Sequence, residues 1–228
     1  MQITIEPRFQ GIEGMAQGGH LAGLISQMSG RELTVRFRRP CPLGRTLDLI
    51  EADGVVRLMD GDLVVLEGWT ADPVADPPPP VSLDAAQDGR RWAESQAFAQ
   101  RITTCFSCGD SAHSFGVHAG RIEGTDLAAT PFSYPEWTAP EGLVESRFLW
   151  APIDCAAGWR VTLGDTGRPA VTGELRVQVH ERPRPGETLI AGATADEWTG
   201  RTRRARSGIY RPDGQLLAAS ESVWVAVG

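Results

Sequence analysis

The chain has 228 residues, 41% of them hydrophobic and 22% charged, which is enough for one large domain or two domains of about 100 residues each. This composition excludes wholesale disorder, and no apolar run reaches the roughly 20 residues of a membrane helix. The net charge is −7 and all 22 basic residues are arginine, a balance that argues against general nucleic-acid binding. The first 14 residues lack the basic-then-apolar pattern of an export signal, so we expect a cytoplasmic protein whose four cysteines are thiols or metal ligands rather than disulfides.

A proline-rich segment divides the chain. Residues 72–80 read Asp-Pro-Val-Ala-Asp-Pro-Pro-Pro-Pro, which predicts a stiff spacer rather than a helix or an inner strand. Ser82 follows as the expected N-cap of a connecting helix that reaches about Arg101. We therefore expect an N-terminal unit of residues 1–72, a linker with its connecting helix over residues 73–100, and a C-terminal unit of residues 101–228.

The two units resemble each other. Glu32-Leu-Thr-Val35 aligns with Glu174-Leu-Arg-Val177, and the Asp60-Gly61 hairpin signal matches Asp213-Gly214. Residues 16–23 align with residues 151–158, which sets Asp154 opposite Gly19. Each unit begins with a short strand, continues with a helix of small residues and ends in long β-branched or aromatic strands, of which the later ones alternate in polarity. The sequence thus predicts a duplicated α+β fold.

This order of elements resembles the hotdog fold in tandem, a double hotdog with two antiparallel sheets, each wrapped around a central helix. Phe9-Gln-Gly11, followed by Gly18-Gly19-His20-Leu-Ala-Gly23, is similar to the glycine-rich helix start of the acyl-CoA thioesterase II family. Trp150-Ala-Pro-Ile-Asp154 is similar to the second helix start in that family, which ends in a catalytic Asp. The resemblance implies an internal pseudo-dimer that hydrolyses a small acyl thioester, with coenzyme A as part of the substrate and no other cofactor. A further homo-oligomer is left open.

The same resemblance implies the catalytic group. In the family, the Asp is assisted by a Thr on a following strand and a Gln on the last strand. Thr172 matches the first position, whereas the second falls on Ser222 or Glu221. Asp154 would act as a general base or a nucleophile, with Thr172 and Ser222 holding water and the amides near Gly18 and Gly19 stabilising the oxyanion.

Each of these residues also has a structural interpretation. Pro152 is a good first helical residue, which predicts Asp154 in the first turn, where a carboxylate stabilises its own helix dipole. Gly18 and Gly19 suit close packing of a helix on a sheet as well as oxyanion binding. His20 is either an acid–base group or structural, and Trp150 either lines an acyl pocket or belongs to the core.

Two further groups are candidate ligand sites. Arg203 and Arg204 belong to an arginine-rich stretch that the first unit lacks, so they are candidates for the phosphates of coenzyme A, with an exposed strand or loop as the alternative. The spacing C-x2-C-x4-H-x4-H of Cys105, Cys108, His113 and His118 is compatible with tetrahedral zinc. A tight turn that leads into a strand explains the same residues, so we expect no metal and keep zinc as the alternative.

The sequence contains no G-x-S-x-G nucleophile motif, no P-loop and no G-x-G-x-x-G motif. Hydrolysis without a covalent Ser or Cys intermediate is therefore the favoured activity. A non-catalytic acyl-binding or scaffold protein and an enoyl-CoA hydratase or dehydratase remain the alternatives, since a fold does not by itself define a reaction.

Overall fold

The computed structural model describes residues 1–97, 99, 103–163 and 168–227. The first half of the chain forms β1 (Gln2–Thr4), η1 (Pro7–Phe9), α1 (Gly18–Ser29), β2 (Leu33–Phe37), β3 (Thr46–Ala52), β4 (Val55–Asp60) and β5 (Leu63–Thr70). The remainder forms α2 (Leu83–Glu94), β6 (Gly120–Arg121), β7 (Ala128–Phe132), η3 (Glu136–Thr138), α3 (Ser146–Leu163), β8 (Ala170–Val179), β9 (Leu189–Ala195), β10 (Thr202–Tyr210) and β11 (Leu216–Ala226).

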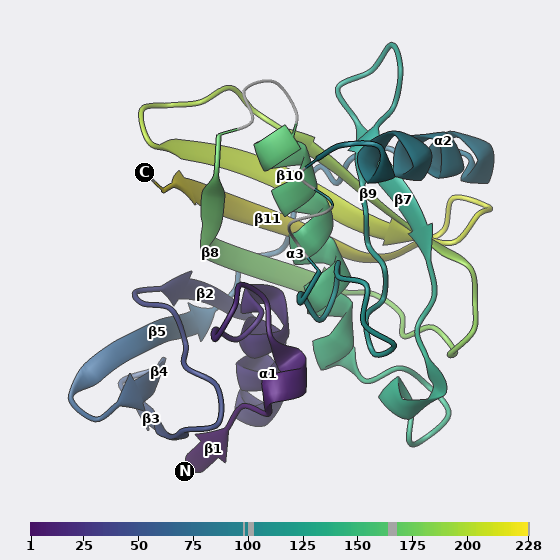
Figure 1. The fold of residues 1–228 in the computed structure, drawn as a ribbon. Coiled ribbons are helices and arrows are strands. Elements are labelled where there is room, and N and C mark those ends of the chain that lie inside the picture. The colour runs from purple at the N-terminus through teal and green to yellow at the C-terminus, as the bar shows by residue number, and fades with distance from the viewer. Residues whose placement is uncertain (98, 100–102, 164–167, 228) are drawn as a thin grey trace.

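All eleven strands belong to one antiparallel sheet of order β1-β3-β4-β5-β2-β8-β11-β10-β9-β7-β6 (Figure 1). The expectation of two sheets is wrong at this point, because β2 pairs with β8 and joins the two halves. In that pairing Val35 lies opposite Leu175 and Arg36 lies opposite Glu174. Each half taken alone would end in an unpaired strand at this edge, and the pairing satisfies the backbone groups of both.

The strand order repeats about the β2–β8 junction. Moving outward, β2-β5-β4-β3 on one side corresponds to β8-β11-β10-β9 on the other. Both Asp-Gly signals lie in hairpins, between β4 and β5 and between β10 and β11. Their glycines, Gly61 and Gly214, have φ values of 59° and 91°, a region that favours glycine. The internal repeat in the sequence is thus a repeat of topology.

The segment between the halves lies against the C-terminal half. Ser82 caps α2, and its hydroxyl accepts the Ala85 amide at 3.2 Å. The tyrosine hydroxyl of Tyr210 donates to the carbonyl of Pro78, which fixes the proline-rich segment on β10. The predicted helix is too long: α2 ends at Glu94, where the Ser95 hydroxyl bonds the Trp92 carbonyl at 2.6 Å. The predicted end at Arg101 lies outside the described residues.

Helices α1 and α3 pack against each other, and α3 also contacts β8, β9, β10 and β11. Figure 1 shows α3 lying across the strands of the C-terminal half, with α1 beside its N-terminal part. The junction between the halves is therefore made twice, by the strands β2 and β8 and by these two helices. Among the described residues, none of the helices has the length and the continuous apolar character of a membrane span.

Candidate active site

Glycines allow α1 and α3 to approach at backbone distance. A Cβ atom on Gly19 would lie 2.4 Å from the Trp150 carbonyl oxygen, and one on Gly23 would lie 2.5 Å from the Arg147 carbonyl oxygen. Trp150 is buried, and its indole packs against Gly23. The structure therefore places Trp150 in the helix–helix contact rather than on an open acyl pocket.

Asp154 lies in the middle of α3 and not in its first turn. The helix begins at Ser146, so Pro152 is an interior residue and the predicted helix start is wrong. A proline inside a helix removes one backbone hydrogen bond, which is why it is usually taken as a boundary. The dipole of its own helix therefore does not account for Asp154. The carboxylate instead faces the N-terminus of α1, where free backbone N–H groups and the helix dipole favour a negative charge.

Three donors bind the Asp154 carboxylate. Its Oδ2 accepts the Gln17 side-chain amide at 2.9 Å and the Gly19 backbone amide at 3.0 Å, and its Oδ1 accepts the Thr172 hydroxyl at 2.8 Å. Since each carboxylate oxygen offers about two lone pairs, Oδ2 is saturated and Oδ1 retains one. The structure thus brings together predicted residues from both halves of the chain around one carboxylate.

Burial raises the pKa of Asp154 to about 6, and the hydrogen bonds from Thr172, Gly19 and Gln17 oppose that rise. The side chain is 3% exposed, so the desolvation of the charged form is the dominant effect. A carboxyl group with this pKa is still mostly ionised at pH 7. Asp154 is therefore a buried, mostly ionised carboxylate held in one orientation.

The half-buried Gly18 lies beside this carboxylate. A Cβ atom built on Gly18 would be 3.5 Å from Asp154 Oδ2, 3.6 Å from the Phe37 ring and 3.8 Å from Thr172 Oγ1. These are ordinary contact distances, so the absent side chain leaves a methyl-sized space next to the carboxylate. The Gly18 amide, at the first position of α1, has no acceptor within the described residues. It is a free donor close to the Asp154 carboxylate.

Gln17 is the residue of this site that the sequence analysis missed. Its amide nitrogen binds Asp154, while its Oε1 accepts the His20 backbone amide at 2.5 Å and so caps α1. The family resemblance places a Gln on the last strand, whereas here a Gln comes from the other half of the chain. The available signal was a polar side chain directly before Gly18-Gly19, at the expected N-cap of a helix.

His20 lies in the core. Its ring is fully buried and stacks on Phe9, with the ring centroids 4.0 Å apart, and on Phe148 at 5.6 Å. Burial, together with the nearby charges of Arg147 and Arg8, lowers the pKa of His20 to about 3. The imidazole is therefore neutral at ordinary pH. The geometry agrees with the structural interpretation of His20 and not with an acid–base role.

Ser222 is not among the residues that hydrogen-bond to Asp154 in the described part of the chain. Its hydroxyl accepts the Trp224 indole N–H at 3.0 Å and donates to the Ala205 carbonyl at 3.4 Å. The expectation that Ser222 holds a water molecule for Asp154 is therefore not supported by a hydrogen bond between the two side chains.

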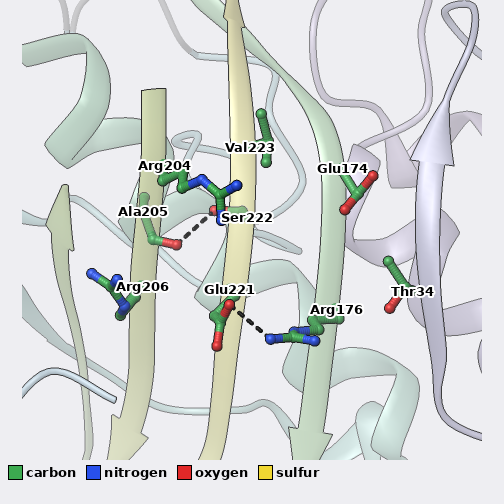
Figure 2. Close-up of a pocket in the computed structure, with 9 residues that line it drawn as sticks. All are labelled: Thr34, Glu174, Arg176, Arg204, Ala205, Arg206, Glu221, Ser222 and Val223. Carbon is green, nitrogen blue, oxygen red and sulfur yellow. Dashed lines mark hydrogen bonds and ion pairs between the residues drawn. The ribbon is translucent and has the colours of Figure 1, made fainter. Parts of the chain in front are cut away.

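The two arginines proposed for coenzyme A phosphates point to opposite faces of β10. Arg203 is buried, and its guanidinium donates to the carbonyls of Asp196 at 2.6 Å and Val161 at 3.2 Å. It is thus committed to the end of α3 and is not accessible to a phosphate. Arg204 is exposed in a shallow hollow on the other face, which Figure 2 shows together with the Arg176–Glu221 ion pair. The sheet separates this hollow from the face that α3 covers, so Arg204 is not a neighbour of Asp154.

The zinc quartet that the sequence analysis kept as an alternative is not assembled. His113 is exposed, and the ring nitrogens of His118 lie 2.9 Å from the Cys108 carbonyl oxygen and 3.3 Å from Glu94 Oε1. Neither histidine belongs to the group of potential ligands that gathers around the thiols of Cys105 and Cys108 in the described residues. The third side chain beside these two thiols is Cys155, the neighbour of Asp154 in α3.

The fold defined by this sheet and its helices is the hotdog fold. A protein of Thermobifida fusca YX, provisionally named a thioesterase II, superposes on the whole of this chain and 92% of its own with a TM-score of 0.60 at 17% identity. A hot-dog-fold protein of unknown function from Alicyclobacillus acidocaldarius does so over 100% and 92% of the two chains with a TM-score of 0.62 at 14% identity.

The tesB protein of Mycobacterium avium subs. paratuberculosis matches 94% of this chain and 88% of its own, with a TM-score of 0.57 at 14% identity. No protein-family model matches the sequence, and no curated protein matches it. The resemblance to thioesterase-like hotdog proteins is thus confirmed at the level of the fold.

Proposed function

We propose that this protein is a thioester hydrolase in which the Asp154 carboxylate activates water against an acyl-CoA. The observation that carries the proposal is the position of that carboxylate. It is buried, oriented by three donors, and adjacent to the free amide of Gly18 at the start of α1. The proposal also includes a tandem hotdog arrangement, in which the half of the chain that contains α1 is one hotdog unit and the half that contains α3 is the other. The fold shared with a protein named as a thioesterase II gives it additional support.

In the proposed reaction, water attacks the carbonyl carbon of the thioester while Asp154 Oδ1 accepts a proton from that water. The carbonyl π electrons move to oxygen and form a tetrahedral oxyanion. When the oxyanion collapses, the carbon–sulfur bond breaks and the sulfur leaves with the bonding pair. The proton on Asp154 passes to that sulfur, so the products are a carboxylic acid and a thiol, and the carboxylate is regenerated.

The donors around Asp154 have different roles in this scheme. The Gly18 amide is proposed to stabilise the oxyanion, since it lies at a helix N-terminus and is not used by the carboxylate. Gln17 and Gly19 fix Oδ2, and Thr172 fixes the plane of the carboxylate through Oδ1. Oδ1 retains the lone pair that takes the proton from water in this scheme, whereas Oδ2 is saturated by Gln17 and Gly19.

The test is thiol release from a series of acyl-CoA thioesters of increasing chain length, measured with the wild-type protein and with Asp154→Asn. The asparagine oxygen can still accept the Gln17 and Gly19 donors, and its amide can donate to the Thr172 hydroxyl, so the fold should persist. Loss of the base should lower turnover at least a hundredfold, a usual contribution of general-base catalysis.

Asp84→Asn is the matched control, because Asp84 lies in the first turn of α2 and is exposed. It should leave turnover unchanged. Wild-type turnover by Asp154→Asn would refute the assignment of the base. No thiol release from any thioester by the wild type would favour an acyl-binding protein, and hydration of an enoyl-CoA would favour the hydratase alternative.

A further inference from the structure

Three buried cysteines from two distant segments meet beside the candidate active site. Cys105 and Cys108 lie in the loop that follows α2, and Cys155 lies on α3. The Sγ atoms of Cys105 and Cys108 are 2.8 Å apart, those of Cys108 and Cys155 are 3.5 Å apart, and those of Cys105 and Cys155 are 3.9 Å apart. All three side chains are buried and none is in a disulfide.

We propose that Cys105, Cys108 and Cys155 form a binding site for a thiophilic divalent cation, Zn²⁺. Sulfur atoms bound to one tetrahedral zinc at about 2.3 Å lie about 3.8 Å from one another. The two pairs that include Cys155 have nearly this separation, and a small rotation of one thiol would bring the Cys105–Cys108 pair to it. This proposal is independent of the proposed hydrolysis.

Nitrogen donors surround the sulfur atoms in the manner of a thiolate site. The Cys108 backbone amide donates to Cys105 Sγ at 3.2 Å, and the Gln17 side-chain amide donates to Cys155 Sγ at 3.6 Å. The His118 ring lies 2.9 Å from the Cys108 carbonyl and so holds a ligand residue from the outer shell. Donors of this kind orient metal ligands and stabilise their negative charge.

The turn that carries Cys105 and Cys108 is built around a glycine. The Gly109 amide donates to the Cys105 carbonyl at 2.7 Å, and a Cβ atom on Gly109 would lie 2.5 Å from the Thr103 carbonyl oxygen and 2.6 Å from the Cys105 carbonyl oxygen. Only glycine fits there without displacing the backbone. The tight turn directs both thiols of the Cys-x-x-Cys pair toward α3, as a shared ligand requires.

The position of the cluster explains what a metal would do for the fold. Residues 103–119 contain no helix or strand, yet residues 105–109 are buried. Ordering a long irregular segment costs conformational entropy. The binding free energy of a metal that links this segment to α3 would offset that cost. Gln17 bonds both Asp154 Oδ2 and Cys155 Sγ, so the metal would also fix the amide that orients the candidate base.

The coordination would be three thiolates with a fourth position open to water or a small ligand. Within the described residues, the group of potential ligands that meets here contains only these three cysteines. Each thiol that binds the cation releases its proton to solvent, so binding is accompanied by proton release.

The test is metal analysis of the full-length, untagged protein purified with a reductant. We expect about one zinc per chain, released when a mercurial blocks the thiols and then captured by a chromogenic chelator. The metal-free protein should bind Cd²⁺ with the ultraviolet charge-transfer band of cadmium thiolates. These measurements use the wild type, so they do not depend on whether a cysteine variant folds.

Variants assign the ligands. Cys155→Ser and Cys105→Ser should each lower zinc affinity at least tenfold, whereas Cys41→Ser, a buried cysteine outside the cluster, should retain one zinc. His113→Ala should retain the metal, because this exposed histidine is not a ligand here. The proposal is overturned if the reduced protein binds no Zn²⁺, if a Cys105–Cys108 disulfide forms in its place, or if zinc content is undiminished in Cys155→Ser.

Discussion

Gly19 and Asp154 face each other across the contact between α1 and α3. The Gly19 amide lies 3.0 Å from Asp154 Oδ2, and a Cβ atom on Gly19 would lie 2.6 Å from the Asp154 Cβ atom. The internal repeat aligns these two positions with each other. At equivalent positions, one half thus contributes a backbone amide without a side chain and the other contributes a carboxylate. The duplicated fold is symmetric in topology, whereas this pair of equivalent positions is asymmetric in chemistry.

Gly19→Ala should destabilise the protein. The new methyl group would overlap the Trp150 carbonyl oxygen at 2.4 Å, and neither backbone has room to move without separating the two helices. Overpacking of this kind costs about 1–3 kcal/mol and occasionally more. Urea denaturation followed by circular dichroism measures the change. An unchanged free energy of unfolding would mean that α1 and α3 are not packed as closely as described.

Gly18→Ala is the companion variant, and it should affect activity rather than stability. Its methyl group would meet Asp154 Oδ2 at 3.5 Å and the Phe37 ring at 3.6 Å, which are ordinary contacts. The free energy of unfolding should therefore stay within about 0.5 kcal/mol of the wild type. The methyl group would, however, occupy the space beside the carboxylate, so thioester turnover should fall at least tenfold. Wild-type turnover by Gly18→Ala would show that substrate and water do not approach Asp154 from this side.

Much of the fold was predictable because its signals are local. Alternating strands and the two Asp-Gly signals are properties of short segments, and they predict the β4–β5 and β10–β11 hairpins. The single sheet was not predictable in this way. It depends on the pairing of Val35 with Leu175, which joins two edge strands far apart in the sequence, and each strand alone looks like the edge of its own sheet.

The site shows the same division. Asp154, Gly18, Gly19 and Thr172 were found through a resemblance of motifs, and the structure places them together. Gln17 was missed because its partner is 137 residues away, and Cys155 was not joined to Cys105 and Cys108 for the same reason. The helix start at Pro152 was predicted wrongly because proline is common at the first position of a helix. In the structure Pro152 lies inside α3, since the contacts of α3 with the sheet and with α1 outweigh the one hydrogen bond that the proline removes.

Thr172→Val should lower turnover while the fold persists. Valine has nearly the shape of threonine but lacks the hydroxyl that donates to Asp154 Oδ1 at 2.8 Å. A hydrogen bond to a charged group contributes about 1.5–3 kcal/mol, so kcat should fall roughly 10- to 100-fold. Thr172→Ser keeps the hydroxyl and should retain most of the activity. If Thr172→Val and Thr172→Ser have the same kcat, the hydroxyl does not orient the base.

His20 should make the protein sensitive to acid, and His20→Phe should remove that sensitivity. The pKa of His20 is lowered from 6.5 in the unfolded chain to about 3 in the fold, chiefly by burial. Between these values the unfolded chain binds a proton at this position and the folded protein does not. The stabilising contribution of neutral His20 is therefore fully present above pH 6.5 and is lost as the pH falls toward 3, with a slope of about 1.4 kcal/mol per pH unit.

Phenylalanine can occupy this position because His20 already stacks on Phe9 and Phe148, and its ring nitrogens have no hydrogen-bond partner in the described part of the chain. The measurement is the difference in the free energy of unfolding between His20→Phe and the wild type at intervals from pH 4 to pH 8. That difference should be constant above pH 7 and should grow in favour of the variant as the pH falls below 6.5, since all other titrating groups cancel. His113→Gln replaces an exposed histidine and serves as the control for the loss of a histidine outside the aromatic cluster. Parallel pH curves for His20→Phe and the wild type would mean that the His20 imidazole is protonated inside the fold, and that the aromatic cluster around it is open to water.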